Sequence, residues 1–247
     1  MAAVVAATLL GNLYLFFGTL LFAGAGLIGG LFPPHDRTIY RVAVAWSRCL
    51  LAASLLRLKV EREAAIDPRG RYIFMANHQS LFDIPVLLAT LPGQTRFLAK
   101  KSLFRIPFFG WALSAMGFIP VDREDRSQAR TVFSSAFDRL TDGTSVLIFP
   151  EETRSLTGQL LPFQRGGFLL ALKSGLPIVP VGLSGTLAVQ PKTSFAIHPG
   201  PVGVRYGSPL EVAQIGLRQK PELIARVRSE IARLAGVTDS LTSSSAG

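Results

Sequence analysis

The sequence predicts an α/β fold: a single domain with a mixed, mostly parallel central sheet flanked by helices, preceded by an N-terminal helical segment. Two observations lead to this prediction. From Leu58 onward, apolar runs of strand length alternate with helical segments, which is the signature of an α/β sheet. Before that point the chain begins with an apolar run that is far longer than a strand.

The first segment, Ala2 to Pro34, contains no charged side chain and is rich in Leu, Phe, Ala and Gly. It is long enough to cross the hydrocarbon core of a membrane as a helix, and the Gly and Pro pairs at its end stop that helix. A secretory signal peptide is disfavoured because the run starts without a basic residue. The sequence leaves open whether the helix spans the bilayer or dips into one leaflet as part of a hairpin.

The next segment, Arg37 to Lys59, is predicted to be a second helix with basic residues among apolar ones. This pattern is typical of a helix at a membrane interface, where long basic side chains reach the lipid phosphates. A plain amphipathic core helix is the alternative. The excess of arginine after the apolar run predicts that the following domain is cytoplasmic, as at the inner membrane of a bacterium. The basic residues are Arg41, Arg48, Arg57 and Lys59.

Seven apolar runs are predicted strands: Lys59–Arg62, Arg71–Ala76, Thr95–Ala99, Phe118–Val121, Thr144–Phe149, Pro177–Val181 and Val202–Tyr206. Five further segments are predicted helices: Ser80–Leu91, Pro107–Met116, Asp125–Leu140, Gly166–Ser174 and Pro221–Leu234. The Ser-rich end of the chain is typical of disorder. We therefore divide the chain into membrane-anchoring helices at residues 1–58, a catalytic α/β domain at 59–236 and a disordered tail at 237–247.

The composition narrows the classes of partner and site. A formal charge of +10 favours acidic partners, which include nucleic acid, anionic lipid, phosphorylated substrates and an acidic carrier protein. A single cysteine, Cys49, excludes a disulfide framework and a cysteine metal site. The three histidines, His35, His78 and His198, lack the spacing of metal ligands, so no metal site is expected.

The candidate catalytic stretch is the heptad Asn77–Asp83, which lies between a predicted strand and a predicted helix. Histidine can take a proton from an attacking hydroxyl near neutral pH, and a carboxylate on its other ring nitrogen fixes the tautomer. His78 and Asp83 can meet only if a strand, a turn and a helix follow one another here. The alternative is a capping box, in which Asp83 accepts a backbone N–H from Ser80 and His78 is an ordinary loop residue.

Polar residues follow four of the predicted strands directly. If these strands are near-parallel neighbours, their carboxyl ends bring one base and several cations to one edge of the sheet, where α/β proteins bind ligands. Basic groups around a histidine suggest a phosphate-bearing substrate whose hydroxyl is activated. These residues are His78, then Lys100 and Lys101, then Asp122 and Arg123, and then Glu151, Glu152 and Arg154.

The heptad and the polar residues that follow these strands belong to short sequence blocks in which the chain resembles the glycerolipid 1-acylglycerol-3-phosphate acyltransferases. Asn77, His78 and Asp83 match the family's N-H-x-x-x-x-D block, and residues 117–123 look like its G-x-I-x-V-x-R block. Residues 149–155 match F-P-E-G-T-R-S, and residues 178–181 resemble a fourth, proline-containing block. One departure is clear, because Glu152 stands where the family usually has glycine.

The resemblance implies the glycerolipid acyltransferase fold and an enzyme of phospholipid biosynthesis. It implies that His78 is the general base and Asp83 its orienting partner. Lys100, Arg123, Thr153 and Arg154 would contact the acceptor's phosphate group, and Glu151 would order that loop. The acyl donor would be acyl-CoA or acyl-carrier protein, used as a co-substrate, with no cofactor, no metal and no covalent acyl-enzyme. The preferred acceptor is lysophosphatidic acid, which gives phosphatidic acid.

Three other readings remain open. Another lyso-lipid, such as a lyso-aminolipid, can serve as acceptor, because the contacts to the head group are the least constrained part of the match. A serine esterase needs a G-x-S-x-G elbow, and residues 182–185 have the wrong spacing. A non-catalytic membrane-bound module for lipid or nucleic acid would carry exposed aromatics beside its charges, but Phe and Tyr lie mostly within apolar runs here, so no nucleic acid is expected.

Overall fold

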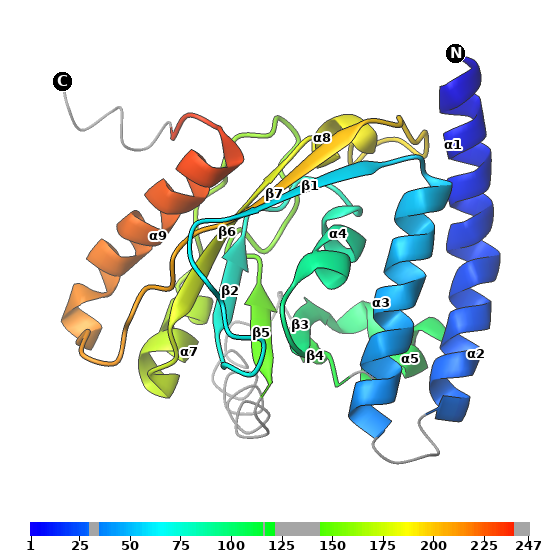
Figure 1. Cartoon of the computed structure of the whole chain (residues 1–247). Coiled ribbons are helices and arrows are strands. Elements are labelled where there is room, and N and C mark those ends of the chain that lie inside the picture. The colour runs from blue at the N-terminus through cyan, green and yellow to red at the C-terminus, as the bar shows by residue number, and fades with distance from the viewer. Residues whose placement is uncertain (30–34, 116, 122–143, 240–247) are drawn as a thin grey trace.

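The computed structural model of the protein describes residues 1–29, 35–115, 117–121 and 144–239. Within them, seven strands form one sheet in the order β1-β7-β6-β2-β5-β3-β4 (Figure 1). Neighbouring strands pair in parallel except β6 and β7, which are antiparallel, so the predicted mixed, mostly parallel sheet is confirmed. The strands are β1 (Arg57–Arg62), β2 (Ile73–Ala76), β3 (Thr95–Lys100), β4 (Ile119–Val121), β5 (Ser145–Ile148), β6 (Ile178–Ser184) and β7 (Pro201–Tyr206).

Helices cover both faces of the sheet (Figure 1). At the N-terminus, α1 (Ala2–Leu13), the π-helical turn η1 (Tyr14–Gly18) and α2 (Thr19–Gly29) follow one another, and α3 (His35–Ala53) packs against them. The other helical elements are α4 (Asp83–Thr90), η2 (Lys101–Arg105), α5 (Phe109–Ala115), α7 (Gly166–Ser174), α8 (Thr186–Val189), η4 (Leu217–Gln219) and α9 (Lys220–Ala235).

The central strand β2 shows how the sheet divides the core. Its side chains alternate between the two faces, as in any strand, and all of them are buried. Phe74 belongs to the cluster that includes α3 and α4, and Ile73 belongs to the cluster under α7 and α9. A parallel strand covered on both faces needs a continuous apolar run, and this is why residues 73–76 could be identified as a strand.

The N-terminal region differs from the prediction at one boundary. The second helix was expected to continue to Lys59, but α3 ends at Ala53 and β1 begins at Arg57. Leu55 has a left-handed backbone with φ of 54°, which turns the chain out of the helix. Arg57 and Lys59 therefore belong to the sheet. The division of the chain into three parts stays a prediction, except for the start of the tail.

Three other expectations differ from the structure or lie outside it. The helix expected from Ser80 begins at Asp83, because Gln79 and Ser80 donate their N–H groups to the Asp83 carboxylate in a turn. The helix expected at 125–140 lies outside the described residues. The disordered tail was placed too early, since Val237 donates a backbone hydrogen bond to Ala232 and packs against the core.

Candidate active site

The heptad Asn77–Asp83 lies at the carboxyl end of β2 and leads into α4. The neighbouring parallel strands β5, β3, β4 and β6 end at the same edge of the sheet, as expected for the first three. Among the described residues, this edge of the sheet therefore collects those that follow β2, β3, β5 and β6. It is the place where open α/β sheets bind ligands.

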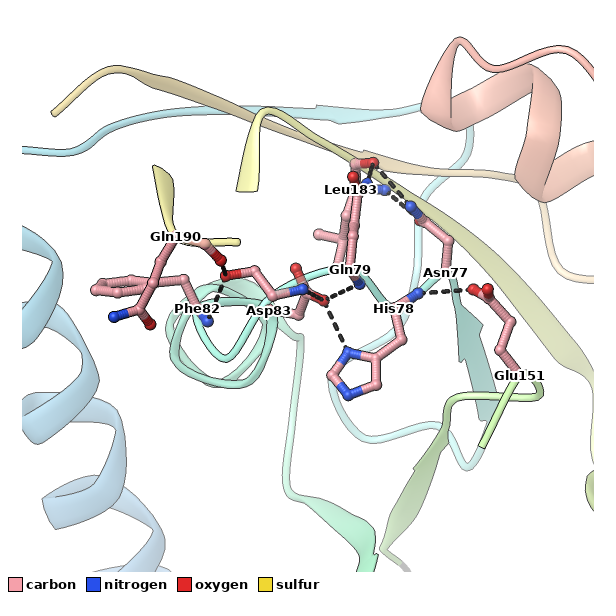
Figure 2. Close-up of polar contacts among 9 residues, drawn as sticks. Asn77, His78, Gln79, Phe82, Asp83, Glu151, Leu183 and Gln190 are labelled. Carbon is pink, nitrogen blue, oxygen red and sulfur yellow. Dashed lines mark hydrogen bonds and ion pairs between the residues drawn. The ribbon is translucent and has the colours of Figure 1, made fainter. Parts of the chain in front are cut away.

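His78 and Asp83 are in direct contact. His78 Nδ1 lies 2.8 Å from Asp83 Oδ2, and the Asp83 side chain is fully buried whereas that of His78 is 10% exposed (Figure 2). The ionised carboxylate can only accept, so Nδ1 carries the ring proton and Nε2 presents its lone pair. Asp83 Oδ2 also accepts the N–H groups of Gln79 and Ser80 at 2.7 and 2.8 Å. Asp83 thus contacts the imidazole and also caps the turn, so the two readings of the motif are not exclusive.

The turn that carries His78 is tied to residues more than a hundred positions away. Asn77 and the backbone of Leu183 exchange two hydrogen bonds, of 3.0 and 2.7 Å, and Gln79 Nε2 donates to the same Leu183 carbonyl. Ser80 Oγ donates to the carbonyl oxygen of Gln190 at 2.8 Å (Figure 2). The end of β6 and the helix after it therefore fix the turn on one side. A side chain on a turn held in this way is well positioned for chemistry.

Residues that follow β5 hold His78 from the other side. The imidazole stacks on the ring of Phe149, with centroids 4.0 Å apart and planes inclined by 18°. Glu151 Oε1 accepts the His78 N–H at 2.8 Å, and Oε2 accepts the Leu161 N–H at 2.9 Å. Burial raises the pKa of Glu151 to about 7, the Asp83 charge adds to this effect, and the two N–H donors oppose it. Glu151 thus links the turn that carries His78 to the Leu161 backbone, and its loop-ordering role stays a prediction.

The predicted phosphate-binding residues are only partly brought together. Arg154 is half-buried on the Glu151 loop, where burial lowers its pKa and the carboxylate of Asp83 partly offsets that effect. Thr153 is exposed, and its Oγ1 accepts a 3.4 Å hydrogen bond from Lys192. Lys100 is exposed at the end of β3, two strands from β2. Arg123 lies outside the described residues.

Glu152 has a left-handed backbone with φ of 58°. An L-residue with a side chain is strained there, by about 1–2 kcal/mol, whereas glycine is not. This geometry gives a physical reason for a glycine at this position of the block. In this chain the strain is retained and a carboxylate is added two positions before Arg154 in the sequence.

Sequence reasoning missed several residues that shape the site. The stacking of Phe149 on His78 and the acceptors Leu183 and Gln190 were not expected. Phe149 belongs to a recognised block, so its position offered a signal. The two acceptors are backbone carbonyls, which leave no trace in the identity of the residue. They could be found only from the fold.

Comparison with known proteins supplies the context. The chain matches the sequence model of the family described as Acyltransferase over residues 57–184. It is 40% identical over 126 residues to the chloroplastic 1-acyl-sn-glycerol-3-phosphate acyltransferase of Brassica napus, which covers 51% of this chain and 36% of that one. It is 36% identical over 181 residues to the 1-acyl-sn-glycerol-3-phosphate acyltransferase of Escherichia coli K12, covering 72% and 73% respectively.

The fold also has a solved counterpart. The crystal structure of the 1-acyl-sn-glycerophosphate acyltransferase PlsC from Thermotoga maritima superposes with a TM-score of 0.82, covers 94% of each chain and is 24% identical in sequence. The likeness extends over the N-terminal helices as well as the sheet. By contrast, the chain spans less than half the length of the plant and algal relatives that it matches.

Proposed function

The chain belongs to the acyltransferase family that includes the 1-acyl-sn-glycerol-3-phosphate acyltransferases, and we propose that it acylates a lysophospholipid. The reaction moves a fatty acyl chain from a thioester to the free hydroxyl of 1-acyl-glycerol-3-phosphate and gives phosphatidic acid. The observation that carries this proposal is the 2.8 Å contact between His78 Nδ1 and the buried Asp83 carboxylate. It leaves Nε2 as a base at the edge of the sheet where the loop with Arg154 also lies.

The proposed mechanism uses His78 twice. Nε2 takes the proton of the acceptor hydroxyl as its oxygen attacks the thioester carbonyl, and Asp83 stabilises the imidazolium that forms. The tetrahedral intermediate then collapses, the carbon–sulfur bond breaks, and the imidazolium returns the proton to the departing thiolate. No covalent acyl-enzyme, metal or cofactor takes part in this sequence. The acyl thioester, as acyl-CoA or acyl-carrier protein, is a co-substrate.

The acceptor's phosphate is assigned to Arg154, Lys100, Thr153 and Arg123. Arginine binds phosphate oxygens with two parallel hydrogen bonds, and lysine adds a compact positive charge. The half-buried position of Arg154 strengthens such a contact, because water screens it less. Glu151 orders the loop that carries two of these residues.

A second acceptor class is favoured by one observation. Glu152, two positions before Arg154 in the sequence, adds a carboxylate to the loop at a position where the family usually has glycine. A negative charge there weakens the attraction for a phosphate dianion and tolerates an amine-bearing head group, as in a lyso-aminolipid. The reaction and the role of His78 are the same for both acceptors.

The N-terminal helices have the surface of a membrane-embedded element. The helix Ala2–Ile28 has a mean hydropathy of 1.9, is long enough to cross a membrane, and has only 17% of its most apolar window buried. Its small residues Ala7 and Gly11 face the protein, while many of its large ones point outward. A Cβ on Gly11 would lie 2.6 Å from Ile197, so the helix docks closely. The outward side chains are 42–69% exposed: Val5, Leu9, Leu10, Leu13, Phe16, Phe17, Leu20, Leu21 and Ile28.

This helix is proposed to lie within one leaflet and not to span the bilayer. Thr8 and Asn12 bond to the loop before β7, through Thr8 Oγ1 with the Ile197 N–H at 3.0 Å and Asn12 Nδ2 with the Phe195 carbonyl at 3.0 Å. A spanning helix would draw this polar domain surface into the hydrocarbon. We place the catalytic domain on the cytoplasmic face of a bacterial inner membrane, in line with the arginines of α3.

The decisive experiment offers the purified full chain a panel of labelled acyl-CoA and acyl-carrier-protein donors together with lyso-lipid acceptors. Product masses identify both substrates. Phosphatidic acid formed from 1-acyl-glycerol-3-phosphate, and lost with His78→Ala, supports the proposal. An acylated aminolipid as the main product would show that the acceptor is a lyso-aminolipid and not 1-acyl-glycerol-3-phosphate. Trapping of an acyl group on the protein would contradict the direct mechanism.

A further inference from the structure

Arg228 is a buried arginine on α9, outside the 57–184 region that matches the family. Its guanidinium donates to two consecutive backbone carbonyls, to Leu161 at 2.6 Å and to Leu160 at 3.0 Å. Its Nε donates to Asp239 at 2.9 Å, and both side chains of this ion pair are at most 7% exposed. A planar group with fixed donors that bonds in three directions holds the segment in front of it in one geometry.

The segment held by Arg228 leads directly to the candidate base. The Leu161 peptide accepts from Arg228 through its carbonyl, and the Leu161 N–H donates to Glu151 Oε2 at 2.9 Å. The other oxygen of Glu151 accepts the His78 N–H at 2.8 Å. A continuous set of hydrogen bonds thus runs from Asp239 through Arg228, Leu161 and Glu151 to the backbone of His78.

The same arginine also acts on the charge of Glu151. Burial is the largest effect on the pKa of this carboxyl group and, together with the charge of Asp83 on α4, raises it; with all effects included the pKa is about 7. Arg228 on α9 lowers it, together with the Leu161 and His78 N–H groups. An ionised carboxylate can accept hydrogen bonds freely through both oxygens, whereas a protonated carboxyl group carries a proton on one of them. A positive charge at 228 therefore favours the state that holds His78.

We propose that Arg228 is a positioning residue of this active site. It fixes the Leu160–Leu161 segment and favours the ionised form of the Glu151 carboxylate, and through both effects it holds the backbone from which the His78 imidazole projects. Arg228 touches neither the substrates nor the reacting atoms, and Asp239 orients its guanidinium. This inference rests on the proposed acyl transfer.

The test compares Arg228→Gln with Arg228→Lys in the full chain, with Arg226→Gln as the control, because Arg226 is exposed on the same helix. The turnover number kcat, both KM values and the thermal unfolding temperature are measured across the pH range. We expect Arg228→Gln to lower kcat about tenfold near neutral pH, with KM values within about twofold. The acid limb of its kcat–pH profile, where kcat falls as the pH is lowered, should move to higher pH. Arg228→Lys retains the charge, so its acid limb stays in place while kcat falls less.

Other outcomes overturn the inference. If the acid limb of Arg228→Gln does not move and activity falls only in step with the folded fraction, Arg228 merely stabilises the fold. If Arg228→Gln does not fold, Asp239→Asn tests the inference instead. Loss of the negative charge at 239 strengthens the effect of Arg228 on the Glu151 carboxylate, so the acid limb should move to lower pH. An unmoved limb in Asp239→Asn contradicts the inference. Wild-type protein that forms no acylated product refutes the proposed function instead.

Discussion

The imidazole of His78 lies flat against the ring of Phe149, with the two centroids 4.0 Å apart. The stack fixes the plane of the imidazole, while the contact with Asp83 fixes its rotation within that plane. The Glu151 carboxylate fixes the backbone behind it. Two different elements, the loop after β5 and the helix α4, therefore restrict the imidazole and the backbone that carries it.

Replacing Phe149 by leucine should lower kcat about tenfold and leave both KM values nearly unchanged. The reason is that leucine fills much of the space but does not hold the imidazole plane, so fewer molecules have the ring in the reactive orientation. Steady-state kinetics measure this effect. Phe97→Leu is the control, because Phe97 is also buried and stacks on Phe118, away from His78. Equal losses of kcat in both variants would contradict a specific role.

Replacing His78 by alanine should reduce kcat about 10²–10⁴-fold, the range for removal of a general base. Asp83→Asn retains the shape of the side chain but not its charge, and should also reduce kcat strongly because the imidazolium loses its partner. His198→Ala is the control, since His198 is an exposed loop histidine. Full turnover by His78→Ala would rule out the mechanism.

Replacing Arg154 by alanine should raise the KM for the phosphate-bearing acceptor at least about tenfold, with a smaller change in kcat. A charged hydrogen bond to a phosphate contributes about 1.5–3 kcal/mol to binding, and the loss appears before the chemical step. Arg218→Ala, an exposed change on η4, should have no effect. A change confined to the preferred length of the acyl chain would show that Arg154 does not bind the phosphate.

The stability of the protein should rise as the pH falls from about 7 toward 4.5. Glu151 has its pKa raised from 4.5 to about 7, so in this window the folded state binds a proton that the unfolded state does not. The full effect is about 3 kcal/mol in the free energy of unfolding. Chemical denaturation across the pH range should show this rise for wild type and not for Glu151→Gln. Glu63, whose pKa Arg233 lowers, acts in the opposite direction and only below this window.

Replacing Glu152 by glycine should increase the free energy of unfolding by about 1 kcal/mol, because the left-handed backbone is then unstrained. Glu152→Ala removes the carboxylate but retains Cβ, so it should give no such gain. Urea denaturation distinguishes the two variants. Assays with phosphate-bearing and amine-bearing acceptors on the same variants report the effect of the charge. If both variants prefer the phosphate-bearing acceptor more strongly than wild type does, the Glu152 carboxylate is what influences the choice of acceptor.

The strands and the His78–Asp83 pair were predictable because their signals are local. A buried strand is an apolar run between turns, and five residues span a strand, a turn and a helix start in only a few ways. The pairing of β1 with β7 and the antiparallel step from β6 to β7 were not predictable. They join residues that lie up to 144 positions apart, and no local pattern records the partner.

In the candidate site, too, residues with a local sequence signal could be predicted, whereas residues whose role depends on long-range packing could not. Glu151 could be assigned to loop ordering from its block, whereas Arg228 looked like any basic residue of an amphipathic helix. Its function depends on the carbonyls that face it, and these are set by the packing of α9 on the sheet. Likewise, the end of α3 was misplaced because Leu55 gives no sign in its identity that it will adopt a left-handed conformation.

The docking of α1 onto Ile197 and the pairing of β1 with β7 have a consequence for biosynthesis. The N-terminal helix and β1 leave the ribosome long before the loop that contacts α1 and the strand that pairs with β1 have been made. During that interval the part of the helix that Ile197 will contact lacks this partner, and lipid is available in its place. The nascent chain should therefore reach the bilayer first and complete its sheet there, so that translation order itself delivers the enzyme to its substrate.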